Sequence, residues 1–405
     1  MSDRTESPQS PSESQTWPRR LIVSRRIRLA CYLVFVAGYA GHAMFRDLAV
    51  APMVGDELHF AEIIDQMHAD GDWIYPKHAS GTPYLNKPPL YFWISTLTYD
   101  AFGEGRFKYR FWSASFGVCC ALLTVLLGAR LFSPEVGGLA GWLLAENDVF
   151  LINHGARIGV FDAMLTFFAL VCFWLYWTVA RRRGDWKGWL LIGIAAAGIS
   201  MLKPGFGIPF VGVVSLHYLW IGPRWIDVRR LRGPILAALV SLVIVAPWYA
   251  LQWERYGETY TNAIFWANYI HRADGTLHPD HVAPAWFYIE TMSLSSFRAF
   301  VPAITCCIIL AFWGRKRRAL RFSLFVMLST VALFSLAKCK LPWYVFPVYP
   351  LAAILISVPT IWFAKAILAR SSLMMDMIRP RLAGALLPRV RSAPASPTLQ
   401  QSRHS

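Results

Sequence analysis

Charged residues are scarce in this sequence, and its cysteines follow no recognisable pattern. Only 16% of the 405 residues are Asp, Glu, Lys or Arg, whereas ordinary soluble domains contain about a quarter. The seven cysteines include two adjacent pairs, and none has the spacing of a set of metal ligands. These deficits exclude an ordinary soluble domain, and they give no support to a zinc-binding or disulfide-stabilised module.

Acidic residues are also in short supply. The chain has 40 Lys and Arg against 24 Asp and Glu, which gives a net charge of +16. A basic excess of this size suits nucleic-acid binding. However, the cations stand in short clusters between apolar runs, which is the pattern of membrane proteins with basic cytoplasmic loops. We therefore expect no nucleic-acid partner.

Long apolar runs are what the sequence has in abundance. Hydrophobic residues make up 56% of it, and a helix needs roughly 20 residues to cross a bilayer. The sequence predicts an all-α polytopic membrane protein with about ten spans, at residues 29–46, 110–131, 135–155, 159–180, 187–202, 206–222, 234–252, 297–314, 320–337 and 342–366. The polar tails at 1–18 and 370–405 are expected to be disordered. The second tail is basic and is placed in the cytoplasm, which leaves 19–369 as the membrane domain.

The apolar segment from Leu90 to Phe102 decides the topology. It has 13 residues, and apolar stretches of about 10–14 residues are more often interfacial than spanning. If it does not span, both tails and the basic clusters at 181–183, 229–232 and 315–318 fall on the cytoplasmic side. If it spans, the three clusters face outward. We therefore expect a juxtamembrane helix here.

This topology gathers the polar segments of the chain on the extracytoplasmic side. They are a long first loop, a second large loop and three short turns, at 47–109, 253–296, 157–162, 203–205 and 338–342. The cytoplasmic turns contain little besides Arg and Lys. Any chemistry is therefore expected outside the cytoplasm.

The first loop has the most unusual composition. Six carboxylates lie between residues 56 and 72, with no Lys or Arg among them. Apolar residues at i, i+3, i+4 and i+7 predict an amphipathic helix that Gly71 ends; they are Phe60, Ile63, Ile64 and Met67. Asp56 stands at the N-cap position, and taken alone it is explained most simply as a helix cap.

A second carboxylate changes that balance. Asp162 lies at the outer mouth of another predicted span, and five cations belong to the same side of the membrane: Lys87, Arg157, Lys203, Arg272 and Lys340. Carboxylates can orient or deprotonate an acceptor, while cations neutralise a departing phosphate. The set therefore indicates group transfer with a phosphate leaving group.

Several other polar residues have both a functional and a structural interpretation. His281 precedes the aromatic run at 286–288, so an interfacial aromatic belt explains it as well as a binding site does. Lys340 could likewise be an anchor. Glu146 and Asp148 lie within the third predicted span, where ionisable groups are usually functional, unless the helix ends before them.

Taken together, these segments resemble a family of integral-membrane glycosyltransferases with the GT-C fold, the aminoarabinose transferases and protein O-mannosyltransferases. The resemblance runs from about Val54 to Leu355. It rests on Gly55-Asp56-Glu57, Ala61-Glu62-Ile63, Gly71-Asp72-Trp73, Lys87-Pro88-Pro89, Arg157 with Asp162, Met201-Leu202-Lys203-Pro204, Pro284 with Trp286-Phe287-Tyr288, and Lys340-Leu341-Pro342 with Tyr344.

The resemblance implies roles for particular residues. Asp56 and Asp162 would lie at the catalytic site, and the phosphate of a lipid-linked donor would be held by Lys87, Lys203 and Arg272. Five more residues would support them: Glu57, Arg157, His281, Lys340 and Tyr344. The nearest likeness is to the bacterial enzymes that move 4-amino-4-deoxy-L-arabinose from undecaprenyl phosphate onto lipid A.

The sequence departs from those enzymes at three places. It has His59-Phe60 where they have Arg-Tyr, Asn86 where they have Glu, and Tyr269 near the place of a His. A divalent ion would draw on that Glu and that His, and an amide oxygen is a poor zinc ligand. We therefore expect an enzyme that needs no metal, with His271 and His281 as the ligands of a rearranged site in the alternative case.

These expectations combine into an inverting glycosyltransferase of the bacterial inner membrane whose site faces the periplasm. The donor would be a polyprenyl-phosphate-linked sugar, and the acceptor lipid A or another cell-envelope glycolipid. A protein acceptor would make the chain a protein O-mannosyltransferase. The alternative from another class is a sugar-lipid transporter. Transporters usually contain repeats and polar residues near the midplane, whereas this sequence has no internal repeat and gathers its polar residues at one face.

Overall fold

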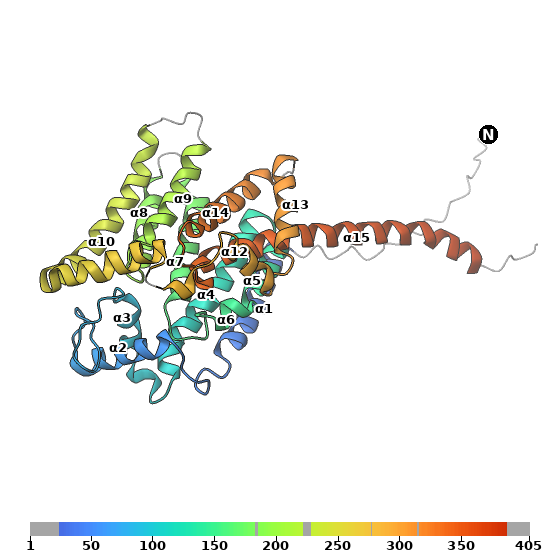
Figure 1. Cartoon of the computed structure of the whole chain (residues 1–405). Coiled ribbons are helices and arrows are strands. Elements are labelled where there is room, and N and C mark those ends of the chain that lie inside the picture. The colour runs from blue at the N-terminus through green and yellow to red at the C-terminus, as the bar shows by residue number, and fades with distance from the viewer. Residues whose placement is uncertain (1–23, 183–184, 222–227, 277, 314–315, 387–405) are drawn as a thin grey trace, which may run out of the picture. The chain divides into compact units, whose positions relative to one another are not determined.

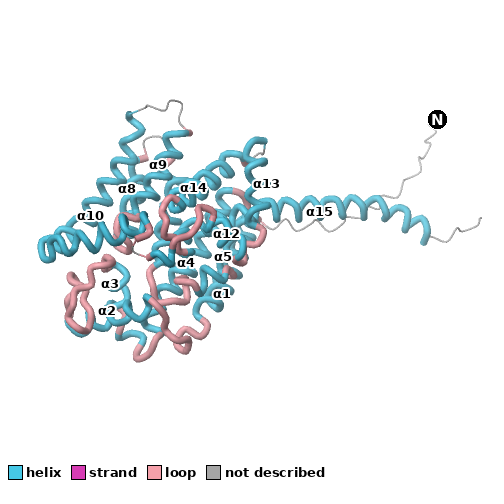
Figure 2. Tube along the Cα trace, in the orientation of Figure 1, coloured by secondary structure: helices cyan, strands magenta, loops and turns pink. Residues whose placement is uncertain are grey.

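The computed structural model describes residues 24–182, 185–221, 228–276, 278–313 and 316–386, and this part of the chain contains helices and no β-strand (Figures 1 and 2). The α-helices are α1 (Arg25–Phe45), α2 (Asp56–Asp70), α3 (Leu90–Leu97), α4 (Phe107–Leu131), α5 (Pro134–Ala145), α6 (Asp148–Ile152), α7 (Asp162–Leu175), α8 (Trp186–Ser200), α9 (Gly207–Trp220), α10 (Val228–Thr261), α11 (His271–Asp274), α12 (Phe287–Leu294), α13 (Phe300–Trp313), α14 (Arg317–Ser335) and α15 (Tyr349–Leu386). Short 3-10 or π-helical segments join them: η1 (Asp100–Phe102), η2 (Tyr176–Ala180), η3 (Asn262–Ile270), η4 (Pro279–His281) and η5 (Pro342–Val348). The predicted all-α class is confirmed.

Six helical segments of the described chain are long and apolar enough to cross a membrane. They are Arg25–Phe45, Phe107–Leu131, Asp162–Ala180, Val228–Asp274, Arg317–Ser335 and Pro342–Ser371. The shorter apolar helices α8, α9 and α13 match three further predicted spans, and α5 matches the remaining one. This last match is partial, because α5 ends at Ala145 and α6 begins at Asp148. Glu146 and Asp148 therefore lie at a helix break, and Asp148 accepts hydrogen bonds from the backbone and hydroxyl of Ser296.

Two predicted boundaries were wrong. The span expected to end at residue 252 continues as helix to Thr261 with a kink at Gly257, and η3 follows it, so the first part of the second large loop is helical. Helix α15 reaches Leu386, where disorder was expected from residue 370, because this segment is rich in the strong helix formers Leu, Met, Ala and Arg. The tails 1–18 and 387–405 lie outside the described residues.

Small residues allow the first membrane helices to approach closely. Gly137 and Gly141 lie four residues apart on α5, and a Cβ atom at Gly137 would collide with the backbone of Val125 and Ala129 on α4. Close backbone approach at such residues is a common way to pack helices in a bilayer. Within the compact unit that ends at Val358, α1 packs on both of these helices, and α7 lies between α4 and α8. Helix α8 in turn packs on α9 and α10 (Figure 1).

Helices α2 and α3 are the predicted juxtamembrane elements. Helix α3 has eight residues, so the segment from Leu90 to Phe102 contains no helix long enough to span. The predicted apolar face of α2 is buried, and Gly71 ends the helix in the left-handed conformation that favours glycine. The ring of Phe60 on this face packs edge-on against Phe92 of α3, with ring centroids 5.3 Å apart. The first loop is therefore folded, and the packing of α2 on α3 holds the N-terminus of α2 in a defined position.

Candidate active site

A cavity of about 280 Å³ brings together seven of the predicted site residues. They are Asp56, Lys87, Asp162, Lys203, Arg272, His281 and Tyr344. These residues belong to seven segments spread from residue 56 to residue 348, namely α2, the loop before α3, α7, the loop between α8 and α9, α11, η4 and η5. Their convergence is the strongest indication that this cavity is a site of chemistry.

Both carboxylates of the cavity begin a helix. Asp56 is the first residue of α2 and Asp162 the first residue of α7, where the positive end of the helix dipole stabilises a negative charge. The N-cap of α2 is Gly55, at a positive φ of 56°, and it lacks a side-chain capping bond. Helix capping therefore does not explain Asp56. Asp56 is exposed, whereas Asp162 is buried.

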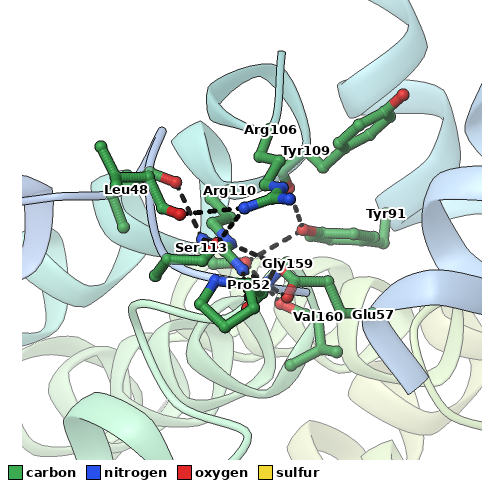
Figure 3. A network of polar contacts seen from close by, with 12 residues as sticks. Leu48, Pro52, Glu57, Tyr91, Arg106, Tyr109, Arg110, Ser113, Gly159 and Val160 are labelled. Carbon is green, nitrogen blue, oxygen red and sulfur yellow. Dashed lines mark hydrogen bonds and ion pairs between the residues drawn. The ribbon is translucent and has the colours of Figure 1, made fainter. Parts of the chain in front are cut away.

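Glu57 does not line the cavity but forms a buried network behind it (Figure 3). Its carboxylate pairs with Arg110 of α4 and accepts the backbone N–H of Gly159 at 2.7 Å. Arg110 also donates to the carbonyl of Leu48 at 2.8 Å and to that of Pro52 at 2.9 Å. This network ties the start of α2 to α4 and to the turn before α7. Glu57 therefore stabilises the segments that carry Asp56 and Asp162. Its partner Arg110 was not predicted from the sequence.

Asp162 has a neighbour that sequence analysis also missed. Nδ1 of His154 lies 3.7 Å from Oδ2 of Asp162. The His154 ring stacks on Trp343, with centroids 3.8 Å apart and planes inclined by 5°. His154 has a positive φ of 57°. Residues other than glycine rarely adopt a positive φ, and those that do are found preferentially at functional sites. Trp343 and His154 thus fix the surroundings of one carboxylate.

Lys87 is held by two amides. Its Nζ donates to Oδ1 of Asn86 and to Oδ1 of Asn268, both at 3.1 Å. The Asn268 amide nitrogen also donates to Oδ1 of Asn86 at 3.0 Å. Asn268, and not the neighbouring Tyr269, therefore faces Asn86; the Tyr269 hydroxyl donates to the Pro204 carbonyl instead.

Burial perturbs the titration of this lysine. Lys87 is 8% exposed. Desolvation first, and the charge of Arg272 second, lower the pKa of Lys87 to about 8, while Asp56 and Asp162 oppose the shift. The ammonium is thus poised near neutral pH and gains stability from any anion that enters the cavity.

Tyr344 links the other two cations. Its hydroxyl accepts a hydrogen bond of 2.6 Å from Nη1 of Arg272. The Nζ of Lys203 lies 3.8 Å from the centroid of the same ring and 3.9 Å from that of Phe206. Burial is the main cause that lowers the pKa of Lys203 well below its usual value. Among the described residues, no ion pair joins Asp56 or Asp162 to any of the three cations.

Besides Glu57, two more predicted supporting residues lie outside the cavity. Arg157 donates to the carbonyl of Arg46 at 2.7 Å. The Nζ of Lys340 donates to the carbonyls of Ala283 and Ala337, at 2.8 and 2.6 Å. Both side chains bind backbone at the edge of the site, and neither reaches its interior.

A group of potential metal ligands lies partly in the wall of the cavity. Ligand atoms of His278, Asp280 and His281 lie within 4.8 Å of one another, and both histidines line the cavity. Imidazole and carboxylate suit a divalent ion such as zinc. His271, the other ligand considered from the sequence, instead has its Nδ1 3.1 Å from the Thr276 hydroxyl.

Comparison with known proteins identifies the class. Residues 86–251 match the family described as dolichyl-phosphate-mannose-protein mannosyltransferase. The undecaprenyl phosphate-alpha-4-amino-4-deoxy-L-arabinose arabinosyl transferase of Pseudomonas aeruginosa strain UCBPP-PA14 is 30% identical over 353 residues, which are 85% of this chain and 59% of that protein. The protein of the same name from Edwardsiella ictaluri is 31% identical over 309 residues, 75% of this chain and 54% of its own length. The chain thus spans less than two thirds of these relatives.

Solved structures agree on the fold. The crystal structure of ArnT from Cupriavidus metallidurans bound to undecaprenyl phosphate superposes with a TM-score of 0.68 and 22% identity, over 89% of this chain and 66% of that one. The apo oligosaccharyltransferase of Archaeoglobus fulgidus gives a TM-score of 0.57 at 13% identity, over 85% of this chain and 51% of that one. The chain is therefore a multi-pass protein of the bacterial inner membrane with the GT-C fold. Part of the chain, residues 86–251, thus matches the protein O-mannosyltransferase family, and most of the chain is similar in sequence to aminoarabinose transferases.

Proposed function

We propose that this chain is an inverting glycosyltransferase that takes a sugar from a polyprenyl-phosphate donor. The observation that carries the proposal is the cavity itself, where Lys87, Lys203 and Arg272 face Asp56 and Asp162 without pairing with them. Three cations without a protein counter-ion suit a phosphate, which carries the complementary charge.

The reaction requires one displacement. The acceptor hydroxyl attacks the anomeric carbon from the face opposite the phosphate, and the bond from that carbon to the phosphate oxygen breaks. Asp56 accepts the proton of the hydroxyl, and Asp162, oriented beside His154, supports it. The electron pair of the broken bond stays on the phosphate oxygen. Lys87, Lys203 and Arg272 stabilise the charge that develops there.

An apolar cavity beside the site supports a lipid-linked donor. It has a volume of about 700 Å³, lies between α8, α9 and α10, and includes Ser200 and Gly205 in its lining. Gly205 is two residues from Lys203, so a lipid chain in this cavity would have its phosphate near the cations. ArnT of Cupriavidus metallidurans, whose fold this chain shares, was crystallised with undecaprenyl phosphate.

The finer assignments are part of the same proposal. The curated relatives are named for transfer of 4-amino-4-deoxy-L-arabinose, and we infer a related sugar donor and lipid A or another envelope glycolipid as acceptor. The positive-inside distribution supports a cavity that faces the periplasm. The three cations can stabilise the leaving phosphate by themselves, so we infer that no metal is required. Were a divalent ion bound, His278, Asp280 and His281 would hold it and it would share in neutralising the phosphate.

The test is turnover by the purified full chain. It is incubated with a panel of polyprenyl-phosphate sugars and a lipid A acceptor, and the release of polyprenyl phosphate is measured. We expect one donor to give polyprenyl phosphate and glycosylated acceptor in equal amounts. Asp56→Asn should abolish both products.

The outcome also separates the alternatives. Transfer to a protein acceptor and not to lipid A would assign a protein O-mannosyltransferase. If no donor is consumed but a sugar lipid crosses the bilayer of a reconstituted vesicle, the chain is a transporter and the proposal is wrong.

A further inference from the structure

A second cluster of cations lies at the ends of α7 and α14 that are remote from the active site. Helix α7 starts with Asp162, and the π-helical segment η2 that continues it ends just before Arg181. Helix α14 runs the other way, from Arg317 to Ser335, toward the cavity residues of η5. The cluster is therefore about one membrane span away from the cavity. In Figure 1, α13 and α14 lie in the upper half of the view, and α2 and α3 lie at its lower left.

This cluster surrounds two adjoining cavities. They have volumes of about 560 and 440 Å³ and share Trp177, Arg181 and Arg318. Six cations from three parts of the chain line them: Arg130, Arg181, Lys316, Arg317, Arg318 and Arg321. As far as the chain is described, no Asp or Glu lines either cavity.

The arginines of the cluster are positioned but not neutralised. Nε of Arg181 donates to the Trp177 carbonyl at 2.6 Å, and its guanidinium stacks on the Trp177 ring with its carbon 4.2 Å from the centroid. Nε of Arg321 donates to the Ala311 carbonyl at 3.1 Å. In the described ranges none of the six cations has an ion-pair partner. Each of these two contacts uses Nε, and the terminal nitrogens suit the two oxygens of one phosphate.

The cations also repel one another. Burial first lowers the pKa of Arg181, and the charges of Arg130, Arg182 and Arg318 lower it further. Bringing these groups together costs free energy that an anion between them would offset.

The surface beside the cavities is apolar. Leu216 and Trp220 lie one turn apart on α9 and are 59% and 45% exposed, and Trp220 lines the larger cavity. A tryptophan next to arginines is typical of the level of the lipid headgroups. A ligand here would meet cations at one end and an apolar helix surface at the other.

We propose that Arg181, Arg318 and their neighbours bind the headgroup of an anionic phospholipid in the leaflet opposite the active site. Its phosphodiester lies against the guanidinium groups, and an acyl chain lies along α9. Basic pockets between membrane helices are known to bind anionic headgroups. The general bias toward cytoplasmic cations does not explain the arrangement, because that bias requires no shared cavity and no stacked guanidinium.

The experiment measures lipid binding to the full chain by native mass spectrometry. The protein in detergent is titrated with phosphatidylglycerol, with phosphatidylcholine and with inorganic phosphate. We expect phosphatidylglycerol to bind more tightly than phosphatidylcholine. The double variant Arg181→Gln with Arg318→Gln should lose roughly tenfold or more of that affinity, since each arginine contributes a charge-assisted contact.

The matched control removes two charges elsewhere at the same face. Arg229→Gln with Arg232→Gln changes exposed cations of α10 that line neither cavity, and it should keep the affinity. Equal loss in both double variants would reduce the effect to total charge and overturn the proposal. Equal binding of phosphatidylcholine, or displacement by an equimolar amount of inorganic phosphate, would overturn it too.

A folding defect is separated by a second variant. Arg181→Lys with Arg318→Lys keeps the charge but loses the planar fork, so its affinity should fall between those of the native chain and the glutamine variant. Without added lipid, the melting temperature of no variant should fall below that of the native chain, because removing Arg181 and Arg318 also relieves their mutual repulsion. These measurements do not involve catalysis, so they test the lipid site independently of the proposed function.

Discussion

Glu57 and Arg110 form an ion pair that is shielded from solvent, with Nη2 of Arg110 2.7 Å from Oε2 of Glu57. The preceding residue, Asp56, is exposed and lines the cavity. Two adjacent carboxylates of one helix start therefore differ in surroundings: one meets a buried guanidinium, and the other meets the space where substrate would lie. Substitution can separate these two roles.

We expect Asp56→Asn to abolish turnover and leave the protein folded, because it removes a charge from the cavity and keeps the shape. Glu57→Gln should instead lower stability, since breaking a buried ion pair by removing one partner costs about 3–5 kcal/mol. Thermal unfolding in detergent and turnover are measured for both variants. Full activity in Asp56→Asn would show that this carboxylate has no catalytic role.

Lys203→Ala should weaken donor binding. A charge-assisted contact to phosphate contributes about 1.5–3 kcal/mol, or roughly 10- to 100-fold in affinity. The matched control is Lys77→Ala, since Lys77 pairs with Asp70 on the first loop and does not line the cavity. Affinity is measured by titration with the polyprenyl-phosphate sugar and, for the phosphate contact alone, with polyprenyl phosphate. An equal change in the two variants would contradict a phosphate contact at Lys203.

Donor affinity should depend on pH through Lys87. Its pKa is lowered to about 8, so the charged fraction of the free protein falls as the pH rises through that value. A phosphate binds the charged form, and affinity should fall above about pH 8 by up to about tenfold per pH unit. Lys87→Arg keeps its charge and should lose this component of the profile. Identical profiles for the native chain and Lys87→Arg would exclude Lys87 as the titrating group.

Activity should survive exhaustive chelation. The reason is that the three cations of the cavity supply positive charge without a metal. Turnover is measured after chelation, with and without added zinc, magnesium and manganese. If chelation stops the reaction and one ion restores it, His278, Asp280 and His281 become its ligands. His281→Ala would then abolish the restoration.

The first loop should be accessible from outside the cell. A cysteine introduced by Ser80→Cys is expected to react with a membrane-impermeant reagent in spheroplasts, and one introduced by Arg317→Cys only after permeabilisation. Labelling of the unsubstituted chain gives the background from its native cysteines. The reverse pattern would invert the topology and place the cavity in the cytoplasm.

The sequence was sufficient to predict the helical class and most helix positions, because long apolar runs and amphipathic periods are local signals. The face of α2 with Phe60 and Met67 was predicted correctly for this reason. Helix ends were less predictable. At the break between Ala145 and Asp148, Asn147 caps α6 by accepting the backbone N–H of Phe150, and Asp148 contacts Ser296. Only the first of these contacts is local in sequence.

The cavity shows the same division. Asp56, Asp162 and the three cations stood in recognisable motifs, so their meeting was predictable. His154 and Asn268 were missed, because Trp343, on which the His154 ring stacks, and Lys87, which donates to Asn268, are distant from them in the sequence. The resemblance assigned Glu57 a supporting role beside Asp56, and the structure places it outside the cavity in the pair with Arg110, because consecutive helix residues point in different directions.

The two amides around Lys87 bear on how the protein would let its product go. The oxygens of Asn86 and Asn268 fix the ammonium without cancelling its charge, as a carboxylate would. If a lipid phosphate binds here as proposed, its departure would leave the buried lysine with these two oxygens as partners. Release of the anion would then be easier than from a lysine without any other partner.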